Sequence, residues 1–217
     1  MSEYQDDEFL AIDRPLSSRE MDHLRAVSTR ARITPVSFVN EYNWGDFKGD
    51  SIEFMRLFLD AHVYLANWGK SLFMVRLPLK AIKKQTITTS CTNSHLTAEK
   101  LPRHWLLTWS RLGNTEDSDP SDFVEETGWM ACLAPVREEL LRGDLRSLYI
   151  GWLKAVSSGE LGDDDSELLP LKGLGELTMA QQALAELLAV DQDLLAGAGI
   201  GKALLTRLVK AGLCRAN

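Results

Sequence analysis

The chain has 217 residues, of which 45% are hydrophobic and 25% charged, and its formal net charge at pH 7 is −7. This composition is ordinary for a folded globular protein and excludes global disorder. The N-terminus is acidic where a secretory signal would be basic, and no apolar run reaches the ~18 residues that a membrane span needs. We therefore expect a cytoplasmic protein with no membrane partner.

The three cysteines and the charge distribution further narrow the classes of protein that the chain can belong to. Cys91, Cys132 and Cys214 are widely spaced, which fits neither a disulfide framework nor a metal knuckle. We expect free thiols, no metal and no cofactor. The acidity is concentrated in residues 113–177, where 15 Asp and Glu stand against 5 Lys and Arg, a net charge of −10. Long acidic connections of this kind are typical of solvated segments.

The first forty residues predict two strands and a helix. Residues 4–13 end in an apolar run that indicates a strand covered on both faces. Ser17, followed three residues later by Glu20, matches the capping box that begins a helix. Residues 36–44 alternate apolar and polar side chains, which predicts a half-buried strand.

The stretch from residue 40 to residue 76 is the most strongly patterned part of the chain. Asp50 can cap a helix, and an apolar stripe then continues to Trp68, so the pattern predicts one long amphipathic helix between them. Residues 72–77 follow as a short strand. The resulting order of strand, helix, strand, helix, strand predicts an α+β fold with a small open sheet of ferredoxin-like type.

Patterning after residue 78 is weaker until the helical part of the chain. Residues 86–88 and 104–109 are predicted as strands, and residues 129–156 as helices that break at Gly143. Thr178 begins another capping box. We therefore divide the chain into an α+β sheet domain (1–112), an acidic loop (113–128), a helical hairpin (129–157), an acidic linker (158–177) and C-terminal helices (178–217).

A binding site is predicted around the turn at residues 40–50. Large aromatic residues beside glycines can form stacking platforms, although the same pairs suit close packing of element ends. Polar residues in the turn and a basic residue on the following strand add hydrogen-bonding groups. The candidate binding residues are Tyr42, Trp44, Asp46, Lys48, Asp50, Trp68 and Arg76.

Two further function classes remain open from the sequence. A nucleic-acid binder resembling RNA-recognition domains would use Phe38, Tyr42, Trp44, Arg76 and the lysines at 80–84, but an overall pI near 5.2 argues against it. An enzyme would place its acid and base groups at Glu41, Asp46 and Asp50. A dyad of Cys91 and His95 is a third catalytic possibility.

Several long phrases resemble a family of uncharacterised bacterial proteins. They are EFLAIDRPL at 8–16, STRARITPVSFVNEYNWGDFKGD at 28–50 and YLANWG at 64–69, with further likeness at GWLKAVSSGEL and LAELLAVDQDLLA. The resemblance covers most of residues 1–196 and implies a bacterial, cytoplasmic origin, but it carries over no activity and no site residue. Since no catalytic set assembles, we expect a non-catalytic protein-interaction or accessory module of a bacterial cytoplasmic assembly, with a protein partner.

Overall fold

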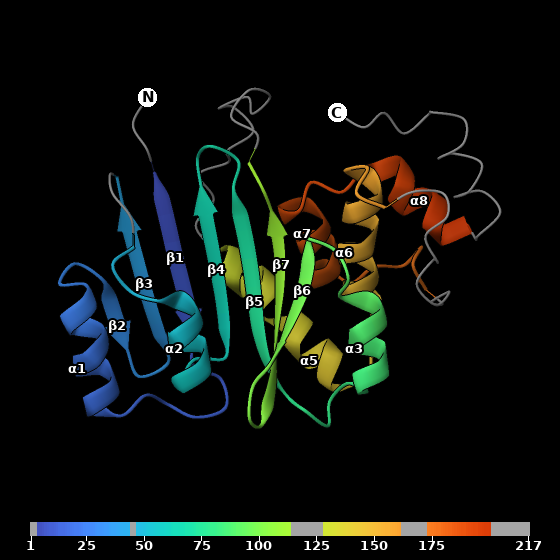
Figure 1. Cartoon of the computed structure of the whole chain (residues 1–217). Helices are drawn as coiled ribbons and strands as arrows, with labels where there is room; N and C mark the ends of the chain where they lie inside the picture. Colours follow the sequence, from blue (N-terminus) through green and yellow to red (C-terminus); the bar gives the residue numbers. More distant parts are fainter. Residues whose placement is uncertain (1–3, 44–46, 114–127, 162–172, 201–217) are drawn as a thin grey trace.

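The fold is α+β and is built on one antiparallel sheet of seven strands (Figure 1). The computed structural model describes residues 4–43, 47–113, 128–161 and 173–200, with side chains up to residue 198. The strand order is β2-β3-β1-β4-β5-β7-β6, and every neighbouring pair is antiparallel. The strands are β1 (Gln5–Leu10), β2 (Arg32–Thr34), β3 (Ser37–Tyr42), β4 (Ala61–Ala66), β5 (Ser71–Pro78), β6 (Leu96–Lys100) and β7 (His104–Arg111).

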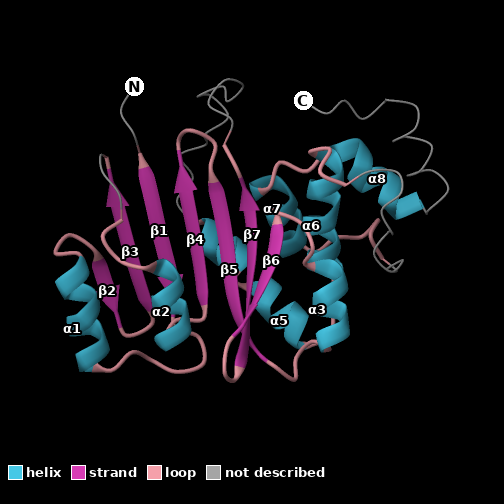
Figure 2. Cartoon of the chain, in the orientation of Figure 1, coloured by secondary structure: helices cyan, strands magenta, loops and turns pink. Residues whose placement is uncertain are grey.

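Two helices cover one face of the sheet, here called the first face, at β2, β3, β1 and β4. They are α1 (Ser18–Val27) and α2 (Ser51–Leu57), and Figure 2 shows both in front of this half of the sheet. The core beneath them is aromatic, with Phe9, Phe38 and Phe54 packed edge to face at centroid separations of 5.6 to 6.2 Å. All three side chains are buried: Phe9 and Phe38 are paired across β1 and β3 and point to the same face, and Phe54 packs onto them from α2.

The remaining helices pack against the opposite, second face at β4, β5, β7 and β6. They are α3 (Lys84–Ser90), α4 (Trp129–Leu133), α5 (Pro135–Leu141), α6 (Arg146–Ser157), α7 (Met179–Leu187) and α8 (Gln192–Ile200). The second core joins strand residues such as Val63, Phe73 and Trp109 to helix residues such as Leu148 and Leu184. The helices that follow residue 128 thus share one hydrophobic core with the sheet.

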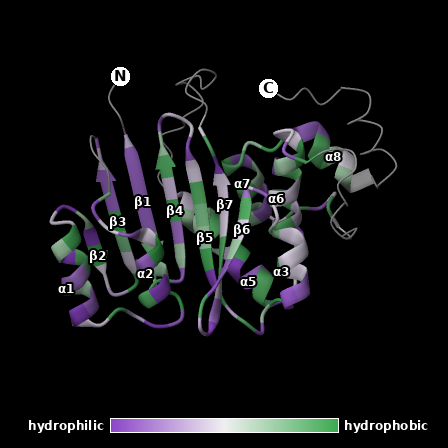
Figure 3. Cartoon of the chain, in the orientation of Figure 1, coloured by the Kyte–Doolittle hydropathy of each residue, from purple (hydrophilic) through white to green (hydrophobic). Residues whose placement is uncertain are grey.

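Strands β4 and β5 contribute to both cores. His62 and Met74 point to the first face, while Val63, Phe73 and Val75 point to the second. Figure 3 shows the result as a mainly hydrophobic β5, whereas β1, on the other side of β4, is mainly hydrophilic. A strand buried on both faces lacks the alternation of apolar and polar residues that marks a half-exposed strand.

This double burial explains the main error of the sequence interpretation. The helix predicted from Asp50 to Trp68 ends at Leu57, and the second half of that stretch is β4. The apolar residues of β4 happened to continue the helical spacing of α2. Asp50 does cap α2 as predicted, since its carboxylate accepts hydrogen bonds from the backbone N–H groups of Ile52 and Glu53.

Other elements were missed or assigned to the wrong class. Residues 86–88, predicted as a strand, lie in the helix α3, because the β-branched Thr-Ile-Thr run favours strands only where neighbours pack on it. The short strands β2 and β6 were not predicted. The capping boxes at Ser17 and Thr178 are both present. Among the described residues, no helix is long and apolar enough to span a membrane.

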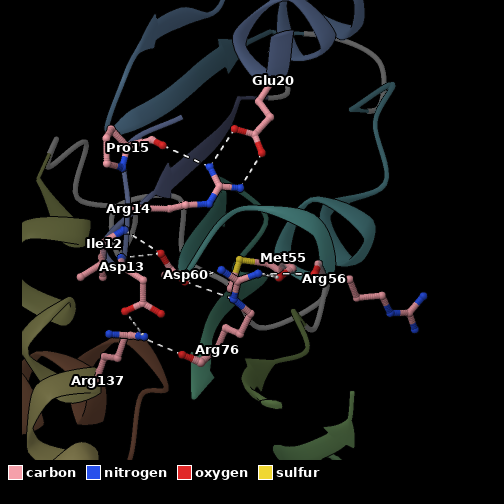
Figure 4. Close-up of polar contacts among 10 residues, drawn as sticks. All are labelled: Ile12, Asp13, Arg14, Pro15, Glu20, Met55, Arg56, Asp60, Arg76 and Arg137. Carbon is pink, nitrogen blue, oxygen red and sulfur yellow. Dashed lines mark hydrogen bonds and ion pairs between the residues drawn. The ribbon is translucent and has the colours of Figure 1, made fainter. Parts of the chain in front are cut away.

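A buried ion pair lies at the end of the sheet where β1 ends and β4 begins (Figure 4). Asp60 is fully buried, and its carboxylate lies 2.6 Å from the guanidinium of Arg76 on β5. The same carboxylate accepts hydrogen bonds from the N–H groups of Ile12 and Asp13 at 2.7 and 2.9 Å. The carbonyl oxygen of Arg76 in turn accepts a hydrogen bond from Arg137 of α5. Every side of the pair is therefore hydrogen-bonded, as a buried charge requires.

Candidate functional site at the end of strand β3

A cavity of about 350 Å³ lies at the end of the sheet where β1 begins and β3 ends. Two tyrosines, one cation, one anion and one amide line it: Tyr4, Arg30, Glu41, Tyr42 and Asn43. The turn at residues 40–50, around which a binding site was predicted, begins at this end of β3. The cavity therefore provides the structural frame for the candidate site.

Strand register brings these residues together from distant parts of the sequence. Gln5 of β1 pairs with Tyr42 of β3 on one side and with Ala66 of β4 on the other. Tyr4 is tied to the end of β4, because its N–H donates to the side-chain oxygen of Asn67 and its carbonyl accepts from the Asn67 N–H, both at 3.1 Å. The wall formed by Tyr4 is thus fixed by backbone contacts.

A chain of buried polar groups supports the other tyrosine. The hydroxyl of Tyr42 donates to the carboxylate of Asp7 at 2.9 Å, and the second oxygen of Asp7 lies 2.7 Å from Nε2 of His62. Asp7 and His62 are each only 2% exposed, and the His62 ring stacks on Phe9 at a centroid distance of 3.8 Å. This network fixes the position of the Tyr42 ring at the cavity wall.

The His62 ring has one nitrogen engaged and one without a partner. A carboxylate that already accepts from Tyr42 is an acceptor, so Nε2 of His62 is the protonated nitrogen and donates to Asp7. Nδ1 is buried and has no hydrogen-bond partner among the residues that the structure describes. Because Asp7 and His62 are closed off from solvent, they position the Tyr42 ring and do not themselves react with a molecule at the surface.

The loop that carries Arg30 is held by its own contacts. Ser28 lies with its hydroxyl 2.6 Å from the side-chain oxygen of Asn40 on β3, and it accepts a hydrogen bond from the Ala31 N–H. Arg25 donates from α1 to the carbonyl of Ala31 at 2.7 Å. The side chain of Arg30 is exposed beside this anchored backbone, so the cation lies at the mouth of the cavity.

Acidic side chains gather on the second face below the cavity. Asp6 pairs directly across the β1/β3 ladder with Glu41, and burial, reinforced by the charges of Glu8, Glu41 and Asp7, raises the pKa of Asp6 from 3.8 to about 7. Burial also raises the pKa of Glu8. Arg32 offsets part of this charge through an exposed ion pair of 2.9 Å with Glu41. The surroundings of the cavity are therefore acidic overall.

The outer edge of β3 is covered along only part of its length. Strand β2 pairs with residues 37–39 of β3, and its three residues end there. Beyond Val39, the loop that leads into β2 lies beside β3 without strand pairing: the Ser28 hydroxyl is 2.6 Å from the side-chain oxygen of Asn40, and Arg30 lines the cavity. This end of β3 continues directly into the cavity.

The structure distributes the predicted binding residues over several environments. Tyr42 lines the cavity, whereas Trp44 and Asp46 lie outside the described residues. Lys48 and Asp50 are exposed, and Asp50 caps α2. The remaining two lie away from the cavity lining. Trp68 is half-buried after β4, and Arg76 is buried at the opposite end of the strands in its pair with Asp60.

The residues proposed for other functions are placed as follows. Phe38 is fully buried under α1 and α2, so it offers no face for stacking a base. Burial raises the pKa of the Cys91 thiol to about 12, which opposes formation of a thiolate, and the ring nitrogens of His95 contact Ser110 and Ser158 instead. The described residues contain no group of three or more His, Cys, Asp and Glu side chains placed to hold a metal ion.

Sequence reasoning missed Tyr4, Arg30, Asp7 and His62 as parts of this site. Asp7 and His62 are 55 residues apart, and only the pairing of β1 with β4 places them side by side. The one signal available in the sequence was His62, a polar residue within the mainly apolar strand β4. Comparisons with models of protein families, with curated proteins and with solved structures found no match.

Proposed function

We propose that this protein is a protein-interaction or accessory module of a bacterial cytoplasmic assembly, and that the cavity at the end of β3 receives side chains of the partner. The observation that carries the proposal is the cavity lined by Tyr4, Arg30 and Tyr42. Tyrosine and arginine are the side chains that most often dominate protein interfaces. A cavity of this size suits one or two partner side chains.

The loop that leads into β2 supplies the second part of the recognition. It lies beside the end of β3, where the Ser28 hydroxyl contacts Asn40 and Arg30 lines the cavity. A partner side chain that enters the cavity would therefore contact Arg30 of this loop as well as Tyr4 and Tyr42. The lining itself carries one cation, Arg30, and one anion, Glu41, so it can pair with a charged side chain of either sign.

The arrangement of the first half of the chain supports the end of β3 as a binding site. We propose a ferredoxin-like relationship for β1, α1, β2, β3, α2 and β4. Its support is the neighbour order β4-β1-β3-β2 together with the position of both helices on one face. In such an arrangement β2 forms the outer strand, and a partner reaches the β3 end without displacing a helix.

The test is a comparison of partner recovery by matched variants in the protein's own host. Affinity purification with quantitative mass spectrometry would use the wild type, Tyr4→Ala and Arg30→Ala. The control is Met179→Ala, because Met179 is 82% exposed at the start of α7 and does not line the cavity. We expect one stoichiometric partner, retained by the control and reduced at least tenfold by each cavity variant. Equal recovery with all variants would show that another surface binds.

A further inference from the structure

A second cluster of reactive groups lies where α6 ends, on the far side of the sheet from the β3 cavity. Ser158 follows the last residue of α6 and is exposed. Its hydroxyl lies 2.9 Å from Nε2 of His95, which is 7% exposed just before β6. An exposed hydroxyl is thus in hydrogen-bond contact with an imidazole that is shielded from solvent.

The backbone fixes the tautomer of this imidazole. Nδ1 of His95 lies 2.9 Å from the carbonyl oxygen of Ser110, and a carbonyl oxygen can only accept a hydrogen bond. Nδ1 therefore carries the proton of the neutral ring, and Nε2 presents its lone pair to Ser158. A nucleophile, a base and a third group that orients the base are the parts of an activated serine.

A carboxylate stands beside the base. Oε2 of Glu160 lies 3.9 Å from Nε2 of His95. The N–H and the hydroxyl of Ser94 each donate to Glu160 at 2.7 Å, which holds the carboxylate in place. A negative charge at this distance stabilises the imidazolium that forms when His95 takes a proton.

We propose that Ser158 is an activated nucleophile that accepts an acyl group from a small activated ester or thioester, with His95 as its general base. Oγ of Ser158 attacks the acyl carbon while its proton passes to Nε2 of His95. The bond from the acyl carbon to the leaving oxygen or sulfur then breaks, and the leaving group takes the proton from Nε2. The result is an O-acyl serine and a free alcohol or thiol. This activity is independent of the binding role proposed for the β3 cavity.

The surrounding backbone limits how fast such a site turns over. The hydroxyl of Ser158 is also 3.1 Å from the carbonyl of Ala155, so the two acceptors share its proton. The N–H of Gly159 donates to Val156, and those of Glu160 and Leu161 donate to Ala155. These amides are engaged and do not stabilise an oxyanion, a contribution worth about 10²–10³ in rate elsewhere. Because formation and release of the adduct both pass through an oxyanion, we expect both steps to be slow.

The experiment measures covalent labelling of the full-length protein by a fluorophosphonate probe. Phosphorus then takes the place of the acyl carbon, and fluoride is the leaving group. Intact-mass analysis and peptide mapping would compare the wild type with Ser158→Ala and His95→Gln. The matched control is Ser157→Ala, because the neighbouring Ser157 hydroxyl donates to the carbonyl oxygen of Lys154 in its own helix. Heat-denatured wild type measures the reactivity of an ordinary serine.

The expected result is one adduct at Ser158 in the native wild type and in Ser157→Ala. The adduct should be absent from Ser158→Ala and from the denatured protein, and its rate should fall about 100-fold or more in His95→Gln. If His95→Gln does not fold, the contrast between Ser158→Ala and Ser157→Ala still decides whether Ser158 is the labelled nucleophile. No adduct in the native protein, or an adduct at another residue, would overturn the proposal.

Discussion

The carboxylate of Asp60 and the guanidinium of Arg76 lie 2.6 Å apart at a fully buried position between β4 and β5. The pair also receives the N–H groups that follow β1, and Arg76 donates to the carbonyl oxygen of Met55 in α2. One ion pair therefore connects three strands and a helix. Its removal should affect the fold as a whole.

We expect Asp60→Asn to reduce the free energy of unfolding by about 3–5 kcal/mol, because Arg76 would keep a buried charge with no counter-ion. For a chain of this size the loss corresponds to a fall of roughly 10 °C in melting temperature. Calorimetry or thermal circular dichroism measures it. The control is Arg56→Gln, which breaks an exposed ion pair with Glu99 and should cost less than about 1 kcal/mol. Equal losses would contradict the assigned role of burial.

Asp6 should make stability fall as the pH rises from about 4 to about 7. Its pKa in the folded protein is about 7 and in the unfolded chain about 3.8, so in this range the folded state holds a proton that the unfolded state has lost. Ionisation then costs folding energy, and the cost is fully present above pH 7. We expect Asp6→Asn to stabilise the protein by about 1–2 kcal/mol at pH 8 and by little at pH 4, after allowing for partial solvent contact.

Denaturant titrations at pH 4, 6 and 8 would test this dependence on Asp6. The matched control is Asp22→Asn, which removes an exposed carboxylate from α1. The prediction fails if Asp6→Asn changes stability equally at all three values of pH, or if Asp22→Asn gives the same profile.

The described cysteines should react with thiol reagents at very different rates. Both are free, but Cys132 is exposed, whereas burial raises the pKa of Cys91 to about 12. Because the thiolate is the reactive form, iodoacetamide at pH 8 should modify Cys132 at least about 100-fold faster than Cys91. The Cys214→Ser variant removes the third thiol from the comparison. Peptide mapping over time gives both rates, and similar rates would show that Cys91 is accessible.

Gly151 should not tolerate a side chain, although it lies within the helix α6. A Cβ at this position would lie 2.9 Å from Cβ of Leu96 and 3.1 Å from Cδ1 of Trp109. In an open helix, Gly→Ala stabilises by up to about 1 kcal/mol. Here we expect Gly151→Ala to destabilise by about 1–3 kcal/mol, since both neighbours are fully buried. A stabilised variant would mean that α6 can move away from the sheet.

Local patterns in the sequence predicted the elements whose signals are self-contained. The capping residues Ser17, Asp50 and Thr178 each bond to the first turn of their own helix, so a few neighbouring residues decide them. The strand at residues 36–44 was recognised as β3 because it is covered on one face and alternates accordingly. The class of fold, α+β, follows from such elements.

Features that depend on distant pairing could not be predicted. The strand β4 resembles a helix in sequence because α1 and α2 cover one of its faces and the later helices the other. The candidate site shares Tyr42 with the binding residues predicted from the sequence, but its other parts come from residues 4, 7, 30 and 62. Only the strand register unites them, and neither spacing nor composition encodes register over such separations.

Strand β5 sends Met74 into the first core and Phe73 and Val75 into the second. The two hydrophobic cores therefore share β5. Unfolding of either core would expose one face of this strand to water and so destabilise the other core. The two cores have no independent route to unfolding, so they form one cooperative unit. A calorimetric scan should show a single heat-absorption peak whose enthalpy matches the van't Hoff value.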